Sequence, residues 1–256
     1  MPRTEIASHR GGAFLWPENS LLAFRNALAL PAEQLELDVH LSADGEVVVM
    51  HDATLDRTTD STGPVRARTL AELRQVRLKG TGGEGVPSLA EAVAMVRDAG
   101  RVLRLEIKGD AEGRPYPGIV ARCLAVLDEA GMRGRTVVMS FQPLTVAEAA
   151  AAGGFVRRVF LLEAKPWRGM GAVGAIALCR ACGAEELGLP VGELDPASVA
   201  ALREAGLGVS AWGANHEETI RRALALGLDA LATDDPPLAL RLRGDAGGVR
   251  EAAASA

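Results

Sequence analysis

The 256-residue sequence predicts an α/β protein with the architecture of a (β/α)8 barrel, or TIM barrel. Short runs rich in Val, Ile and Leu alternate with longer Ala- and Leu-rich stretches of helical character. Glycine follows six of the helical stretches, where a left-handed C-terminal cap favours it. Eight strand–helix units in about 250 residues match both the unit count and the size of this barrel.

The expected elements alternate along the whole chain. We expect strands at residues 5–8, 35–39, 102–107, 136–140, 158–162, 186–190, 208–211 and 230–233. We expect helices at residues 20–30, 88–99, 117–130, 144–152, 170–182, 196–205, 217–226 and 237–242. Ser88-x-x-Glu91 and Thr145-x-x-Glu148 resemble capping boxes at two helix starts. A doubly wound open sheet is the alternative, but the Gly-rich nucleotide-binding turn is absent after the first strand.

The spacing of the elements predicts a single catalytic domain over residues 1–243. Its largest irregularity is an insertion at about 53–86, between the second strand and its helix, where HDATLDRTTDSTG and KGTGGEG have the composition of loops. The small, polar residues 244–256 are expected to form a flexible tail.

Composition excludes several functional classes. The formal net charge of −5 offers no basic surface for nucleic acid. No apolar run is long enough to anchor the chain in a membrane, and the N-terminus lacks the apolar core of a secretion signal. Three cysteines are too few for a disulfide scaffold. We therefore expect a soluble, cytoplasmic protein with no nucleic-acid partner and no stable membrane anchor, and we leave open whether it forms a homo-oligomer.

Acidic residues recur on two successive strands. In LELDV, Glu36 and Asp38 share the face opposite the leucines, and in LEIK, Glu106 and Lys108 do the same. Such a face is usually solvated, but in a closed barrel it points inward, and its C-terminal end lies where active sites form. Three clustered carboxylates need a cation between them, and an all-oxygen ligand set suits one divalent ion, Ca²⁺ or Mg²⁺.

Histidines and other basic residues occur at neighbouring strand ends. His9 follows the first strand, and His51 ends the apolar run EVVVMH that comes after the acidic strand. Arg10 offers a planar fork of donors for a phosphate, and Lys108 adds a compact charge. A cation, two histidines and two basic side chains around one point indicate a site for a phosphate ester.

These motifs together resemble one enzyme family. HRGG, PENS, ELDVHLSADGEVVVMHDATLDRTT, VPSLAEA and LEIK, followed more weakly by SF, AW…N and ATDDP, are similar in order to the glycerophosphodiester phosphodiesterases, particularly the cytosolic bacterial members. The resemblance implies a TIM barrel that hydrolyses glycerophosphodiesters to sn-glycerol 3-phosphate and an alcohol. The roles that it implies are acid/base catalysis by His9 and His51, metal binding by Glu36, Asp38 and Glu106, and phosphate binding by Arg10 and Lys108.

Aromatic residues near strand ends are candidates for the wall of the pocket. We expect Trp212 to contact the substrate and Phe14, Trp16, Phe141 and Trp167 to line the pocket, although loops over a barrel also need apolar cover. Two other functions remain open: a lysophospholipase D that holds an acyl chain there, or a barrel that binds a phosphate ligand without turnover. The sequence does not decide between Ca²⁺ and Mg²⁺, or between water and a substrate hydroxyl as nucleophile.

Overall fold

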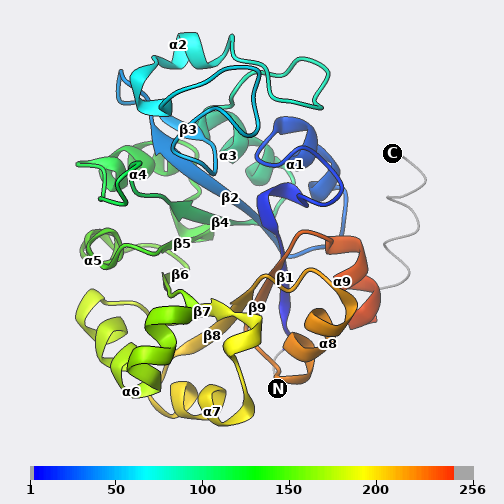
Figure 1. Ribbon diagram of the computed structural model, residues 1–256, viewed down its shortest axis with the longest axis vertical. Helices are drawn as coiled ribbons and strands as arrows, with labels where there is room; N and C mark the ends of the chain where they lie inside the picture. The colour runs from blue at the N-terminus through cyan, green and yellow to red at the C-terminus, as the bar shows by residue number, and fades with distance from the viewer. Residues whose placement is uncertain (1–2, 245–256) are drawn as a thin grey trace.

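The protein is a closed barrel of eight parallel strands surrounded by helices, as the sequence predicts (Figure 1). The computed structural model describes residues 3–244. The parallel strands are β1 (Glu5–Ser8), β2 (Gln34–Leu41), β4 (Val102–Ile107), β5 (Thr136–Ser140), β6 (Arg157–Leu161), β7 (Glu186–Pro190), β8 (Gly208–Trp212) and β9 (Ala230–Thr233). The barrel closes because β1 pairs with both β9 and β2.

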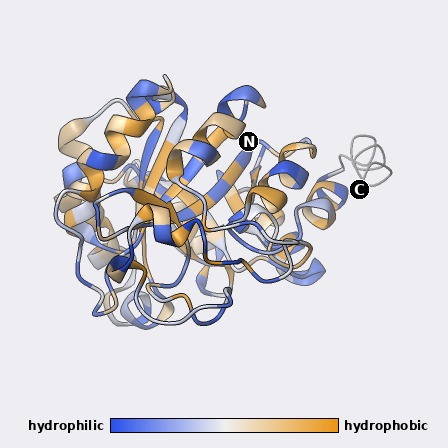
Figure 2. Cartoon of the chain, turned by 90° about the horizontal axis from the view of Figure 1, so that it is seen from above, coloured by the Kyte–Doolittle hydropathy of each residue, from blue (hydrophilic) through white to orange (hydrophobic). Residues whose placement is uncertain are grey.

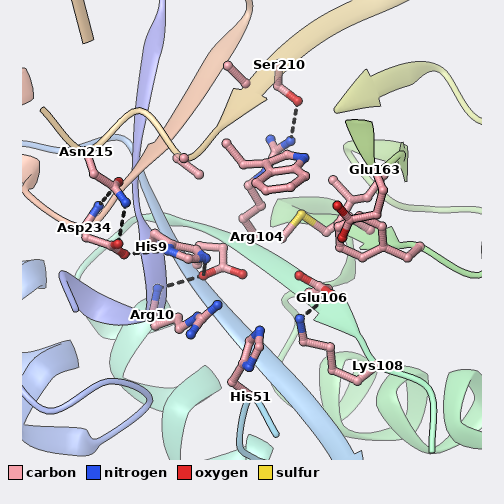
Figure 3. A pocket seen from close by; sticks show the side chains of 18 residues that line it. His9, Arg10, His51, Arg104, Glu106, Lys108, Glu163, Ser210, Asn215 and Asp234 are labelled. Atoms are coloured by element: carbon pink, nitrogen blue, oxygen red, sulfur yellow. Dashed lines mark hydrogen bonds and ion pairs between the residues drawn. The ribbon is translucent and has the colours of Figure 1, made fainter. Parts of the chain in front are cut away.

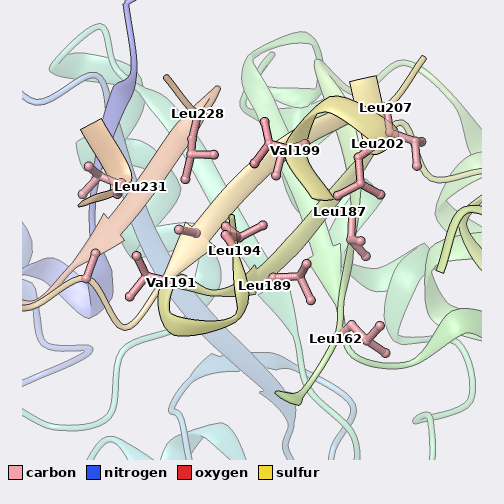
Figure 4. Close-up of a cluster of buried hydrophobic side chains, with 14 of the residues drawn as sticks. Leu162, Leu187, Leu189, Val191, Leu194, Val199, Leu202, Leu207, Leu228 and Leu231 are labelled. Atoms are coloured by element: carbon pink, nitrogen blue, oxygen red, sulfur yellow. The ribbon is translucent and has the colours of Figure 1, made fainter. Parts of the chain in front are cut away.

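Helices cover the outside of the barrel and bury their apolar faces against it. They are α1 (Leu21–Leu28), α3 (Leu89–Asp98), α4 (Ile119–Glu129), α5 (Pro143–Ala152), α6 (Ala164–Cys182), α7 (Pro196–Glu204), α8 (Glu217–Ala225) and α9 (Pro236–Arg243). Leu187 and Leu189 of β7 lie in one buried cluster with Val199 and Leu202 of α7 (Figure 4). Burying each such side chain contributes about 1.5–3 kcal/mol. Figure 2 shows both hydrophobic and hydrophilic segments in the helices, as expected of helices with one buried face.

The register of β2 and β4 determines where the acidic residues meet. Asp38 of β2 lies opposite Glu106 of β4, and Glu36 lies opposite Arg104. Leu35 and Leu37, on the other face of β2, are buried in the same cluster as helix α3 residues. The alternation in the sequence therefore sends the leucines to the helices and the carboxylates into the barrel.

The segment between β2 and α3 contains structure that the sequence did not predict. β3 (Val47–Val49) turns back and pairs antiparallel with β2, because a two-sided apolar run of three valines suits a short buried strand. A single-turn helix, α2 (Leu70–Leu73), follows with a capping box between Thr69 and Glu72. Val48, Leu55 and Leu73 belong to the separate small core of this segment.

One expected capping box and one expected helix start are wrong. Helix α5 begins at Pro143 after Gln142, and Thr145 lies buried inside the helix, so it forms no capping box. Helix α6 begins at Ala164 rather than at residue 170, with a break at Gly171, where φ is +60°. The Gly-rich sequence around residue 170 marks this break and not the start of the helix. By contrast, Ser88 and Glu91 form the expected capping box of α3.

The remaining expectations about the fold concern the C-terminal tail, the limits of the domain and membrane anchoring. The predicted tail falls on residues 244–256, of which 245–256 lie outside the described residues. The limits of the catalytic domain stay a prediction. Within residues 3–244, no helix has the length and apolar character needed to cross a membrane.

Candidate functional site

Three carboxylates meet inside the barrel at the C-terminal ends of β2 and β4. Glu36, Asp38 and Glu106 each offer an oxygen within 4.8 Å of the other two, and all three side chains are buried. This is the trio that the sequence predicts. Their placement follows from the pairing of Asp38 with Glu106 across two parallel strands.

Lys108 compensates part of this negative charge. Its Nζ lies 2.9 Å from Asp38 Oδ1 and 2.5 Å from Glu106 Oε1. Burial raises the pKa of Glu36, and the charge of Asp38 raises it further. Burial also disfavours the charged form of Asp38, but Lys108 and the nearby histidines outweigh it and lower the pKa of Asp38. The surroundings therefore favour the charged form of Asp38 and disfavour the charged form of Glu36.

The trio suits a hard divalent cation. Glu36 Oε1 is buried and has no hydrogen-bond partner among residues 3–244. A buried carboxylate oxygen without a partner is costly unless a cation approaches it. The donors are all oxygens, which Mg²⁺ and Ca²⁺ prefer. These three residues therefore fit the metal that the sequence predicts.

Arg10 borders the trio from the turn that follows β1. Its backbone adopts a left-handed conformation (φ +51°, ψ +27°), which is uncommon for arginine. In this conformation the Arg10 N–H donates to Glu36 Oε2 at 2.7 Å, and Nε lies 3.5 Å from Asp38 Oδ2. Nη1 donates to Glu18 at 3.1 Å. The turn thus brings a guanidinium group to the edge of the carboxylates.

His9 has one ring nitrogen fixed by an aspartate. Its Nδ1 donates to Asp234 Oδ1 at 2.6 Å, and Asn215 Nδ2 donates to Asp234 Oδ2 at 2.6 Å. An ionised carboxylate only accepts hydrogen bonds, so the proton is assigned to Nδ1. Burial lowers the pKa of His9, but the charge of Glu36 and the bond to Asp234 outweigh it and raise the pKa. His9 Nε2 lies 4.0 Å from Glu36 Oε2.

His51 repeats this arrangement on the other side of the site. Its Nδ1 donates to Asp52 Oδ1 at 2.7 Å, which leaves Nε2 available. Burial lowers the pKa of His51; the charge of Asp38 opposes this, while Lys108 and Arg10 reinforce it. Figure 3 shows His9, Arg10, His51, Glu106 and Lys108 around one space, coming from different segments of the chain. The sequence predicts this grouping.

A pocket of about 330 Å³ joins these groups to an apolar wall. His9, Arg10, Glu36, His51, Glu106 and Lys108 line its charged side. Met139, Phe141, Leu161 and Trp212 line the other side, with the Phe141 and Trp212 rings edge to face at 6.0 Å. Two of the five expected pocket aromatics thus lie in this pocket.

The other three aromatics require correction. Trp167 lies inside α6 with only 8% of its surface exposed and packs in the core, because the helix begins earlier than expected. Phe14 is 55% exposed and lies against the ring of His216. Trp16 packs on Gly12 and lines a separate small cavity with Glu18. A position at or just after a strand end is therefore not sufficient to place an aromatic side chain in the pocket.

Sequence reasoning gave no role to several polar residues of the site. Asp234 and Asn215 stand in ATDDP and AW…N, and Asn19 stands in PENS, so each lies in a quoted motif. Asn19 is buried and bonds Asp38. For Asp52, the sequence signal of a role in the site is its position directly after His51. The sequence shows that these residues lie in the motifs, but it does not show which residues they bind by hydrogen bonds.

Comparisons with known proteins agree with this geometry. The family model described as "Glycerophosphoryl diester phosphodiesterase family" matches residues 9–238. A glycerophosphodiester phosphodiesterase from Caldanaerobacter subterraneus subsp. tengcongensis is 27% identical over 248 residues, covering 94% of this chain and 98% of its own.

Two solved structures have the same fold over nearly the whole chain. A candidate glycerophosphoryl diester phosphodiesterase from Agrobacterium tumefaciens is 34% identical with a TM-score of 0.92, covering 95% of this chain and 98% of that one. A phosphodiesterase from Oleispira antarctica, solved with its product sn-glycerol 3-phosphate, is 26% identical with a TM-score of 0.82 and the same two coverages. The chain studied here therefore belongs to the glycerophosphoryl diester phosphodiesterase family.

Proposed function

We propose that this enzyme hydrolyses glycerophosphodiesters to sn-glycerol 3-phosphate and an alcohol, with a divalent cation and two histidines. One observation carries the proposal. Two histidines with Nδ1 bonded to aspartates line the same pocket as a buried trio of carboxylates with an unpartnered oxygen. The product bound in the Oleispira relative supports the same substrate class.

Glu36, Asp38 and Glu106 would hold one Ca²⁺ or Mg²⁺ ion. A bound divalent ion supplies Lewis acidity, which stabilises negative charge on phosphoryl oxygens. Arg10 adds a guanidinium group at the edge of the trio, and its planar donors match phosphate oxygens. Lys108 adds a point charge that is already held by Asp38 and Glu106. Together these groups would bind and orient the diester.

His9 and His51 would serve as the general acid and base. Each histidine keeps its proton at Nδ1 through an aspartate, so proton exchange with substrate takes place at Nε2. Hydrolysis needs one group that removes a proton from the nucleophile and one that protonates the leaving alcohol. Two histidines in one pocket satisfy that requirement.

The apolar wall would receive the organic part of the substrate. Phe141 and Trp212 offer ring faces and edges to carbon-bound hydrogens. Trp212 Nε1 is buried and has no hydrogen-bond partner in the described part of the chain, so it is available to a substrate oxygen. A pocket of about 330 Å³ lies at the small end of ligand sites and suits a glycerophosphodiester.

The size of the pocket disfavours lysophospholipase D activity, because a long acyl chain would extend beyond it. Turnover of glycerophosphocholine compared with its lyso form tests this alternative. Release of sn-glycerol 3-phosphate would support the proposal, and binding without release would support a non-catalytic barrel. Phosphorus NMR of early products identifies the nucleophile, because only attack by the glycerol hydroxyl releases a cyclic ester.

Other expectations from the sequence stay predictions. These are the cytoplasmic location, the absence of a nucleic-acid partner and a homo-oligomeric state. The choice between Ca²⁺ and Mg²⁺ belongs to the proposal and is tested by metal rescue of the chelated enzyme.

A further inference from the structure

Arg57, from the insertion after β2, joins two carboxylates beside the site. Its Nε donates to Asp52 Oδ2 at 2.7 Å and its Nη2 donates to Asp52 Oδ1 at 2.9 Å. Its Nη1 and Nη2 each donate to one oxygen of Glu18 at 2.7 Å. The guanidinium group thus uses two of its edges, one for each carboxylate.

Each of these carboxylates contacts a residue of the proposed site. Asp52 accepts from His51 Nδ1 at 2.7 Å, and Glu18 accepts from Arg10 Nη1 at 3.1 Å. Arg57 is therefore two contacts away from His51 and from Arg10, which both line the pocket. The series of contacts His51–Asp52–Arg57–Glu18–Arg10 connects the segment after β3 with the turn after β1.

The backbone of Arg57 is also fixed. Lys79 Nζ donates to the Asp56 and Arg57 carbonyl oxygens at 3.1 and 3.0 Å, and the Lys79 N–H donates to Thr58 O. Lys79 is one of only three lysines in a chain with 28 basic residues. These bonds anchor the loop, so the Arg57 side chain is presented from a defined position.

The exposure of Arg57 argues against a role in stability alone. Its side chain is 47% exposed, so solvent screens its ion pairs with Glu18 and Asp52. Glu18 and Asp52 are less exposed, at 16% and 27%. Arg57 thus forms a bidentate pair with each carboxylate at a position where solvent screening limits the contribution to folding stability.

We propose that Arg57 is a positioning residue for the phosphodiesterase reaction, holding His51 through Asp52 and Arg10 through Glu18. This inference rests on the proposed roles of His51 and Arg10. A lysine cannot replace Arg57, because an ammonium group has no pair of planar edges. Through Arg57, the insertion thereby contributes to catalysis by holding His51 and Arg10 in their relative positions.

The test compares Arg57→Ala and Arg57→Lys with Arg74→Ala. Arg74 is a matched control in the same insertion, 51% exposed and paired with one carboxylate, Glu91. We expect Arg57→Ala to lower kcat/KM about 10- to 100-fold, the usual effect of removing an outer partner of a site residue. Arg57→Lys should remain nearly as impaired, and Arg74→Ala should match the wild type. Arg57→Ala and Arg74→Ala should each lower Tm by no more than a few degrees, because both side chains are about half exposed.

Two branch variants separate the contacts of Arg57. Asp52→Asn should mainly lower kcat, because His51 Nδ1 then faces a neutral amide in place of a carboxylate, and Glu18→Gln should mainly raise KM, because Arg10 loses its charged partner. Added guanidinium ion should restore part of the activity of Arg57→Ala and none of the activity of Asp52→Asn. Wild-type kcat and KM in Arg57→Ala, or full activity in Arg57→Lys, would overturn the proposal.

A readout independent of turnover distinguishes this proposal from the proposed function. Nitrogen NMR of the His51 ring reports whether Nδ1 carries the proton. We expect Arg57→Ala and Asp52→Asn to change that signal, and Arg74→Ala to leave it unchanged. An unchanged signal in Arg57→Ala would overturn the role of Arg57. A changed signal together with full activity of His51→Ala would instead overturn the acid/base role of His51 and leave the positioning intact.

Discussion

Asn19 and Asp38 bind each other through two hydrogen bonds at the base of the carboxylate trio. Asn19 Nδ2 donates to Asp38 Oδ2 at 2.8 Å, and the Asp38 N–H donates to Asn19 Oδ1 at 3.3 Å. Asn19 is buried and has a left-handed backbone, with φ at +54°. Asparagine is among the few residues that tolerate this conformation while also offering a donor and an acceptor.

Removing the Asn19 amide is expected to weaken metal binding. Asn19→Ala and Asn19→Gly both lose the contacts to Asp38, and a lost partner of a metal ligand costs about 10- to 100-fold in affinity or activity. Glycine accepts a positive φ and alanine does not, so only Asn19→Ala should also lose stability through strain. Titration of activity with Ca²⁺ and urea denaturation measure the two effects. Equal metal affinity in the wild type and Asn19→Gly would contradict the role of the side chain.

The two histidines are expected to be individually essential. His9→Ala and His51→Ala should each lower kcat about 10²- to 10⁴-fold. Asp234→Asn should also be severely impaired, because the new amide can donate to His9 Nδ1 and move the ring proton to Nε2. Asp235→Asn is the matched control, since Asp235 caps α9 by accepting from the Leu238 N–H. Equal kcat in the two aspartate variants would contradict the proposed tautomer of His9.

A buried ion pair that includes the pocket-lining residue Arg104 is expected to affect stability non-additively. Arg104 Nη2 donates to Glu186 Oε1 at 2.6 Å, and both side chains are almost fully buried. Glu186→Leu leaves a buried guanidinium group without a carboxylate, which should cost about 3–5 kcal/mol of unfolding free energy. Adding Arg104→Met should recover part of that loss. Arg157→Met removes the more exposed partner of Glu186 and should cost less. Strict additivity in urea denaturation would contradict this account.

Stability is expected to fall in acid through Glu33. Burial disfavours the charged form of Glu33, but hydrogen bonds from Arg243 and the Ile6 N–H outweigh this and lower its pKa. A lowered folded-state pKa means that the contribution to stability is present above the ordinary value of about 4.3 and declines as pH falls below it. The unfolding free energies of the wild type and Glu33→Gln should therefore differ at pH 7 and converge as pH falls below the lowered pKa of Glu33. A difference that does not change with pH would contradict this.

The barrel and its carboxylate trio could be predicted because both depend on short-range patterns. Alternation places Glu36 and Asp38 on one face of β2, and the same pattern places Glu106 on one face of β4. Adjacent parallel strands then bring these positions together without further information. The prediction of a metal-binding trio required only the strand order.

The aspartate that binds His9 could not be predicted, because it comes from a distant part of the chain. His9 and Asp234 are 225 positions apart, and residue types alone do not select one aspartate among many. The position of Trp167 was predicted wrongly for a local reason. The glycines that follow it are typical of a loop, so the sequence did not predict that α6 begins before Trp167. β3 was missed because EVVVMH continues the apolar character of β2, and only the turn reveals the hairpin.

The central claim is that the buried carboxylates hold a metal for glycerophosphodiester hydrolysis. The most direct measurement is the rate of sn-glycerol 3-phosphate release from glycerophosphocholine by the EDTA-treated wild type and by Glu36→Gln, before and after addition of Ca²⁺ or Mg²⁺. The account predicts no release after chelation, recovery of the wild type with metal, and no recovery of Glu36→Gln. Undiminished release in EDTA, or equal recovery of the variant, would contradict it.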